Sequence, residues 1–163
     1  MIFSVLTVSD RCSKGETQDK SGQLLSELLA PYGTVREYKI VPDEMKDITE
    51  ALIYMCDFVR SDVIFTTGGT GFAPRDITPE ATKAVIEKDV PGISEAIRYE
   101  SLKITPKAML SRAVSGIRGK TLIINLPGSP KAVKESLEVV LPVLSHAVET
   151  LSGNTQSCGG NYK

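Results

Sequence analysis

Three short runs in this sequence are apolar at nearly every position, the pattern of strands that are covered on both faces of a parallel sheet. They are residues 2–9, 62–67 and 121–126. A fourth run, residues 35–41, alternates apolar and charged side chains, which favours an edge strand. Because segments with helical periodicity separate these runs, we predict an α/β fold with three layers, in which helices cover both faces of a mainly parallel sheet.

Five helices are expected between and after these strands. Apolar residues recur at helical spacing over residues 24–29, 47–59, 78 to about 91, 93–102 and 131–151. Thr78 and Pro79 are predicted as the N-cap and first residue of the third helix. Pro142 predicts a kink in the last helix. Residues 103–119 fit neither periodicity, and they leave room for an additional strand or hairpin.

The length is that of one globular domain, and the charge is too balanced to indicate a strongly charged partner. The 163 residues include 19 basic and 20 acidic side chains, a net charge of −1, which gives no reason to expect nucleic acid or an anionic membrane. No apolar run approaches the ~20 residues of a membrane span. We predict one domain over residues 1–151 and a flexible tail over residues 152–163, where apolar periodicity is absent.

The cysteines and the one histidine exclude several kinds of chemistry. Cys12, Cys56 and Cys158 are odd in number and scattered, which favours a reduced, cytoplasmic protein over a disulfide framework or a zinc knuckle. His146, the single histidine, projects from the side of the last helix opposite its apolar face, so we expect it at the surface. Carboxylates, hydroxyls and backbone amides are therefore the groups expected to carry any chemistry.

All four predicted strands end in polar or glycine-rich segments. Ser9 and Asp10 follow the first strand, Asp43 follows the second, and the segments 67–71 and 127–130 follow the third and last. In an open parallel sheet, ligands bind beyond the carboxyl ends of the strands. These four segments are therefore predicted to form one binding site along a shared edge of the sheet.

The segment Thr66–Gly71 (TTGGTG) is predicted to bind an anion. Its glycines permit positive φ, so that successive backbone N–H groups can surround a phosphate, and the hydroxyls of Thr67 and Thr70 add donors. The segment is neither a Walker P-loop nor a dinucleotide fingerprint. A tight turn without a ligand is the alternative, but the continuation through Arg75 and Asp76 to a helix start favours the anion.

Asp43 and Asp76 near such a loop suit a Mg²⁺ ion held between protein oxygens and a polyphosphate. Each also has a structural alternative, since Asp43 can cap a turn and Asp76 can pair with Arg75 or Arg11. Together on one edge they favour phosphoryl or nucleotidyl transfer. Ser129 is predicted to cap the last helix, whose first amides can add to the anion site.

Several motifs in a fixed order resemble one known family. They are Thr7-Val8-Ser9-Asp10-Arg11, Asp19-Lys20-Ser21-Gly22, Val41-Pro42-Asp43-Glu44, Thr66–Gly71, Arg75–Thr82, Pro91-Gly92, Leu110-Ser111-Arg112 and Leu126–Pro130. The chain resembles, over residues 2–151, the molybdopterin-binding MogA/MoaB family of molybdenum cofactor biosynthesis proteins, which is related to a domain of gephyrin. Ser111 and Arg112 carry no functional interpretation apart from this resemblance.

The resemblance implies an adenylyl transfer in which ATP and molybdopterin, with Mg²⁺, give adenylyl-molybdopterin and pyrophosphate. It implies a homotrimer or a trimer-based hexamer, and other molybdenum cofactor enzymes as partners. Asp43 and Asp76 become the expected essential acids, which hold Mg²⁺ or orient the terminal phosphate of molybdopterin. The expected substrate-binding residues are Ser9, Asp10, Thr67, Gly68, Gly69, Thr70, Gly71, Arg75, Ser111, Pro127, Gly128 and Ser129.

Two other functions remain open at this point. A non-catalytic molybdopterin-binding or scaffold protein of the MoaB type would bind the pterin without releasing pyrophosphate from ATP. A general nucleotide-binding regulator would bind ATP and no pterin.

Overall fold

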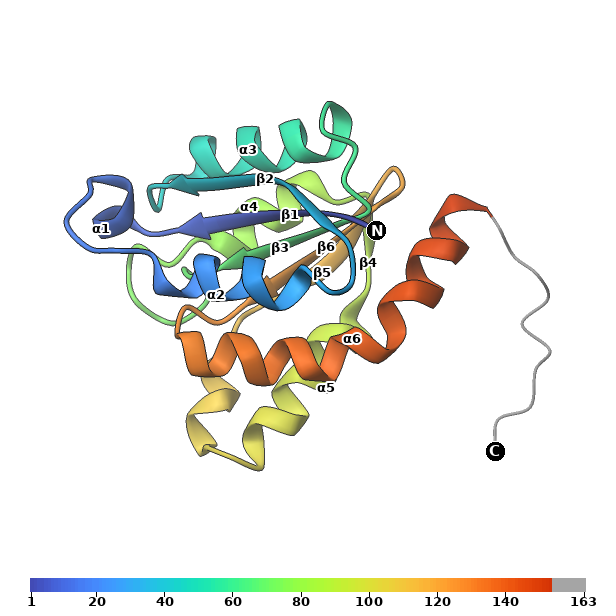
Figure 1. The fold of residues 1–163 in the computed structure, drawn as a ribbon. Helices are drawn as coiled ribbons and strands as arrows, with labels where there is room; N and C mark the ends of the chain where they lie inside the picture. Colours follow the sequence, from blue (N-terminus) through green and yellow to red (C-terminus); the bar gives the residue numbers. More distant parts are fainter. Residues whose placement is uncertain (154–163) are drawn as a thin grey trace.

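The computed structural model describes residues 1–153, which fold around a six-stranded sheet (Figure 1). The strands are β1 (Ile2–Val8), β2 (Thr34–Val41), β3 (Val63–Thr67), β4 (Lys88–Asp89), β5 (Ser115–Arg118) and β6 (Thr121–Leu126). Their order across the sheet is β2-β1-β3-β6-β5-β4. β2, β1, β3 and β6 run parallel, whereas β5 is antiparallel to both β6 and β4.

Helices cover both faces of the sheet. They are α1 (Asp10–Ser13), α2 (Lys20–Leu29), α3 (Met45–Asp57), α4 (Thr78–Val85), α5 (Pro91–Leu102), a 3-10 helix η1 (Pro106–Leu110) and α6 (Pro130–Ser152). In Figure 1, α3 and α4 lie on one side of the sheet, and α2, α5 and α6 lie on the other. The predicted three-layer α/β fold with a mainly parallel sheet is confirmed.

The alternation of side chains along β3 explains the two core layers. Val63 and Phe65 face α2, α5 and α6, while Ile64 faces α3 and α4. All three side chains are fully buried, and β6 is buried along its whole length. Because successive side chains of a strand point to opposite faces, a strand covered on both faces must be apolar throughout.

The predicted hairpin exists, but its neighbour β4 was not predicted. β5 and β6 are joined by Gly119 and Lys120, so the segment 103–119 holds both a 3-10 helix and a strand. The third helix is shorter than expected and ends at Val85. Beyond it, the N–H groups of Glu87 and Val90 donate to carbonyls of β5 (2.7 and 2.9 Å), and this pairing replaces a further helical turn.

Two predictions about helix ends have opposite outcomes. Ser129 caps α6 as predicted, because its hydroxyl accepts from the N–H of Ala132 at 3.3 Å. The prediction for Thr78 is wrong: Thr78 is the first residue of α4, and its hydroxyl donates instead to the carbonyl of Gly68 at 2.9 Å. The buried hydroxyl thereby joins α4 to the glycine loop.

The long helix α6 contains Pro142 and changes direction along its length (Figure 1). His146 is exposed on it, as predicted. Of the predicted tail, Ser152 and Gly153 complete the end of α6, and residues 154–163, with Cys158, lie outside the described residues. Within the described part of the chain, we find no helix both long and apolar enough to cross a membrane.

Candidate functional site

Two loops that follow adjacent parallel strands form the centre of the site. Loop 67–71 leaves β3, loop 127–130 leaves β6, and these strands pair in register up to Thr67 and Leu126. The Thr67 hydroxyl donates to the Pro127 carbonyl at 2.8 Å. The backbones approach so closely that a Cβ on Gly128 would lie 3.3 Å from the Cα of Gly68. The two loops therefore make one continuous wall.

A polar pocket of about 440 Å³ lies on one side of this wall. The predicted site residues that line it are Ser9, Asp43, Thr67, Gly68, Gly69, Asp76 and Gly128. Arg11, Asp19, Lys20 and Ser21, which were not predicted as site residues, line it as well. The pocket thus combines carboxylates, hydroxyls, glycine backbone and two cations, the groups that a polyphosphate and its metal ion require.

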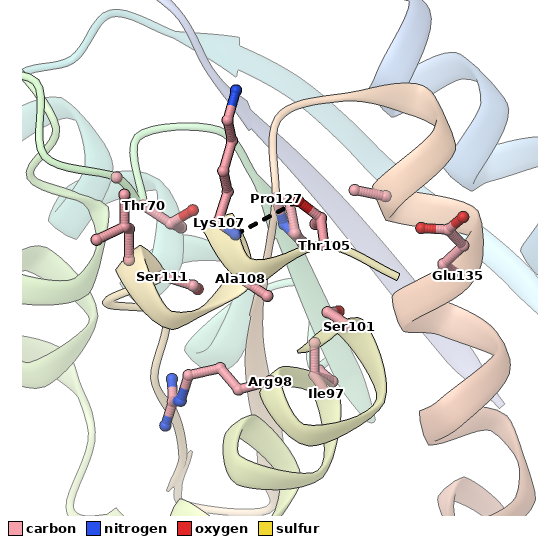
Figure 2. Close-up of a pocket in the computed structure, with 13 residues that line it drawn as sticks. Thr70, Ile97, Arg98, Ser101, Thr105, Lys107, Ala108, Ser111, Pro127 and Glu135 are labelled. Atoms are coloured by element: carbon pink, nitrogen blue, oxygen red, sulfur yellow. Dashed lines mark hydrogen bonds between the residues drawn. The ribbon is translucent and has the colours of Figure 1, made fainter. Parts of the chain in front are cut away.

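A second, largely apolar pocket of about 290 Å³ lies on the other side of the wall (Figure 2). The predicted residues Thr70, Gly71, Ser111 and Pro127 line it, together with Ile97, Arg98, Ser101, Thr105, Lys107, Ala108, Leu110, Ala132 and Glu135. Figure 2 shows Thr70 and Ser111 on one side of the pocket and Glu135, on α6, on the other. An apolar lining with a few polar groups suits a flat heterocycle.

Asp43 is held between the ends of β1 and β2. Its Oδ2 accepts from the backbone N–H of Asp10 at 2.8 Å, and Oδ1 of Asp10 accepts from the N–H of Asp43 at 3.1 Å. Burial raises the pKa of the Asp43 carboxyl, and the negative charges of Asp10 and Asp76 raise it further, against the Asp10 N–H and Arg75. The two predicted acids are therefore close enough to interact electrostatically.

Asp76 lies in the loop between β3 and α4. Its Oδ2 accepts from the N–H of Ala73 at 3.0 Å, and its own N–H donates to the Ala73 carbonyl at 2.9 Å. A Cβ on Gly71 would come within 2.9 Å of the same oxygen. The carboxylate is therefore folded back against the glycine loop and reaches the polar pocket.

Arg75 is occupied by protein carboxylates and lines neither pocket. Its guanidinium donates to both oxygens of Asp10 at 2.9 Å and to Glu44 at 2.8 Å. These contacts lower the pKa of Asp10 and raise that of Arg75. Arg75 and Asp10 thus join the ends of β1, β2 and β3, while Arg11 and Lys20 are the cations at the pocket.

The glycine pair in the loop adopts the left-handed conformation that the sequence suggested. Gly68 and Gly69 have φ of 97° and 65°. The hydroxyl of Thr78 donates to the Gly68 carbonyl at 2.9 Å, and its N–H donates to the Gly69 carbonyl at 3.1 Å. Both carbonyls therefore have partners on α4, and the Gly68 N–H donates to the Leu126 carbonyl at 3.4 Å, which together hold the turn in place.

The floor of the polar pocket is organised by the buried acid Asp19. Its Oδ1 caps α2 by accepting from the N–H groups of Ser21 and Gly22, and its Oδ2 accepts from the hydroxyls of Thr7 and Tyr38, both at 2.5 Å. Burial and this carboxylate raise the pKa of Tyr38. The Ser21 hydroxyl in turn donates to the Gly128 carbonyl at 2.7 Å, which fixes α2 against loop 127–130.

The remaining predicted residues support the loops. Ser9 caps α1 by accepting from the N–H of Cys12, and Ser129 caps α6 without lining a pocket. Arg11 and Lys20 stood within motifs of the resemblance but gave no separate signal. Ser101, Lys107 and Glu135 come from α5, η1 and α6, elements whose relative placement the sequence pattern did not reveal.

The carboxylates fit Mg²⁺ shared with a substrate, not a metal site made by protein alone. Among residues 1–153 we find no cluster of three or more His, Cys, Asp or Glu side chains able to hold a metal ion. Asp43 and Asp76 supply two. Because Mg²⁺ commonly binds one or two carboxylates and completes its shell with water and substrate phosphates, the pair is sufficient when a polyphosphate is present.

Comparison with known proteins gives consistent similarities. Residues 4–146 match the protein family described as "Probable molybdopterin binding domain". The molybdopterin adenylyltransferase of Helicobacter pylori is 50% identical over 93% of this chain and 88% of its own. The enzyme of that name in Escherichia coli is 44% identical over 85% of this chain and 72% of its own. The crystal structure of the molybdopterin biosynthesis enzyme MoaB from Thermus thermophilus superposes with a TM-score of 0.87, at 49% identity over 93% of this chain and 96% of that one.

Proposed function

We propose that this chain is a molybdopterin adenylyltransferase, because it belongs to the molybdopterin-binding family of molybdenum cofactor biosynthesis proteins. The observation that carries the proposal is the pair of pockets on either side of one glycine wall. The apolar pocket suits the pterin, and the polar pocket, which holds Asp43, Asp76 and two cations, suits the phosphates of ATP. The wall between them is where the two substrates meet.

The transfer joins the terminal phosphate of molybdopterin to the α-phosphorus of ATP. A phosphate oxygen forms the new bond to the α-phosphorus while the bond to the bridging oxygen of the β-phosphate breaks, and pyrophosphate leaves with that oxygen. A phosphate monoester has a second pKa of about 6, so the nucleophile is ionised at neutral pH and no protein base has to accept a proton. This agrees with the exposed position of His146.

The residues of the chain then contribute by orientation and charge. Asp43 and Asp76 would hold Mg²⁺, which supplies positive charge to the phosphates of ATP during the displacement. Arg11 and Lys20 line the same pocket and supply further positive charge. The glycine loop offers its backbone N–H groups to the phosphate of molybdopterin.

The test is pyrophosphate release from molybdopterin, ATP and Mg²⁺ by the parent and by the Asp43→Asn and Asp76→Asn variants. We expect both substitutions to lower turnover by about 100-fold or more, with melting temperatures no lower than that of the parent. Asp57→Asn is the matched control, because Asp57 pairs with Arg118 and lines neither pocket. Full turnover in both site variants would refute the roles of the acids.

The same assay distinguishes the adenylyltransferase from the two other candidate functions. A parent protein that binds molybdopterin without ATP-dependent pyrophosphate release would be a binding or scaffold protein of the MoaB type. A parent that binds ATP and no pterin would be a nucleotide-binding regulator.

We also propose that the protein is cytoplasmic and forms a homotrimer or a trimer-based hexamer. In this assembly it would interact with other molybdenum cofactor enzymes. Large apolar side chains are exposed on α5 and the segment that follows it, among them Tyr99, Ile104 and Met109, which supports burial in an assembly. Light scattering measures the mass in solution, and a monomer at micromolar concentration would contradict this part of the proposal.

A further inference from the structure

Arg112 contacts the glycine loop that forms part of the wall between the two pockets. It follows η1 and precedes β5, and it lines neither pocket, although its neighbour Ser111 lines the apolar one. Any effect of Arg112 on the reaction must therefore act through the residues that it contacts.

The contacts of Arg112 converge on one loop. Its backbone N–H donates to the Thr70 carbonyl at 2.9 Å. Its side chain donates from Nε to the Gly71 carbonyl and from Nη2 to the Asp76 carbonyl, both at 2.7 Å. Nη1 pairs with Glu80 on α4. One guanidinium thus bridges both ends of the turn from Gly71 to Asp76 and attaches that turn to a helix.

The bridged turn contains the carboxylate that reaches the polar pocket. Inside the turn, two hydrogen bonds join Asp76 and Ala73, and the stretch 72–75 is exposed. Thr70 and Gly71, at its other end, line the apolar pocket. The position of the turn therefore sets both the Asp76 carboxylate on one side of the wall and the surface offered to a pterin on the other.

We propose that Arg112 is a positioning residue for adenylyl transfer, which holds the turn from Gly71 to Asp76 so that the two pockets keep a fixed relation to each other. The inference rests on the proposed function for its meaning. Arg112 contacts no substrate in this proposal. Its role is to keep the attacking phosphate aligned with the nucleotide.

The chemistry of the guanidinium is necessary for this role. Its donors lie in a rigid planar fork, so that two carbonyls and a carboxylate can be bound in one fixed geometry. A lysine ammonium keeps the charge and can reach one or two of these acceptors, but it does not impose the fork. Arg112→Lys therefore removes the bridge while leaving the charge in place.

The test compares Arg112→Lys with Arg118→Lys. Arg118 is a matched control: its side chain is 26% exposed against 33% for Arg112, it pairs with Asp57, and it donates to the Val85 carbonyl. It lines neither pocket. Both variants therefore lose a half-buried guanidinium that holds a carboxylate and a carbonyl, and one of the two lies at the site.

We expect Arg112→Lys to lower kcat by about 10- to 100-fold, since small misplacements of reacting groups cost rates of that order. KM for ATP and for molybdopterin should change by less than about threefold, because no substrate contact is lost. Arg118→Lys should keep kcat within about twofold of the parent. A kcat that is unchanged in Arg112→Lys, or lowered equally in both variants, would overturn the inference.

A second measurement does not depend on activity. Amide hydrogen exchange should be about fivefold faster or more in peptides covering residues 70–78 of Arg112→Lys, and unchanged there in Arg118→Lys. Unchanged exchange in both variants would overturn the positioning role. A parent that lacks turnover would refute the proposed function, and the exchange comparison would then decide whether Arg112 holds the turn.

Discussion

Replacing Gly69 by alanine perturbs the glycine loop at its most constrained point. Gly69 has a φ of 65°, and an added Cβ would lie 2.3 Å from the Thr78 hydroxyl and 3.1 Å from Oδ1 of Asp43. The first distance requires Thr78 to move, although its side chain is fully buried and donates to the Gly68 carbonyl. The substitution therefore affects the turn, its anchor on α4 and one predicted acid together.

The cost follows from these contacts. The left-handed conformation costs an alanine about 1–2 kcal/mol, and displacing a buried hydroxyl from its partner costs about 1–3 kcal/mol more. We therefore expect a loss of about 2–5 kcal/mol in the free energy of unfolding. For a domain of this size, that corresponds to a drop of about 6–15 °C in melting temperature.

Gly119→Ala separates the two contributions. Gly119, in the turn between β5 and β6, has a φ of 55°, and a Cβ there would meet nothing within 4 Å. This control should lose about 1–2 kcal/mol and keep full activity. Thermal melting and pyrophosphate release measure both variants. Equal melting temperatures, or parental turnover in Gly69→Ala, would refute the argument that the loop is fixed by Thr78 and works as part of the site.

Three further predictions address single groups of the site. Burial raises the pKa of Asp43 in the folded protein, so its ionised carboxylate destabilises the native state at neutral pH. Asp43→Asn keeps an acceptor for the Asp10 N–H, and it should therefore raise the free energy of unfolding at pH 7; in denaturant titrations this gain should shrink as the pH falls below the raised pKa and vanish below the ordinary pKa of an aspartate. Lys20→Met should raise KM for ATP about three- to tenfold, whereas Lys46→Met, an exposed residue paired with Glu50 on α3, should leave it unchanged. Ala132→Phe should fill the apolar pocket, raising KM for molybdopterin about tenfold or more while calorimetry finds ATP binding unchanged.

The sheet and the place of the candidate site in the fold could be predicted because burial on two faces leaves a strong signal. The apolar runs at β1, β3 and β6 allowed one interpretation, and the alternation in β2 identified the edge strand. Because the strands are parallel, their carboxyl ends could be placed at one edge of the sheet without knowing any side-chain contact. For the same reason, loops 67–71 and 127–130 could be placed at one edge of the sheet, whereas the direct pairing of β3 with β6 was not predicted.

The partners of individual side chains could not be predicted, because they depend on distances between elements. Arg75 was expected at a phosphate, and it is paired with Asp10 and Glu44. Thr78 has the sequence pattern of an N-cap, yet its hydroxyl donates to the Gly68 carbonyl in the loop that follows β3. β4 is two residues long and carries Lys88 and Asp89, so it has no apolar pattern, and it exists because β5 offers it backbone partners.

The distribution of charges explains how a chain with one exposed histidine can catalyse this transfer. Since the nucleophile is a phosphate that is ionised at neutral pH, no residue has to serve as a base. Arg75 is neutralised by carboxylates, so Arg11, Lys20 and the backbone amides are the positive groups of the protein that are available to the substrates. The protein then has to align the two substrates. The loops at the carboxyl ends of the strands provide the rigidity that this alignment requires, because most of their polar groups hydrogen-bond one another.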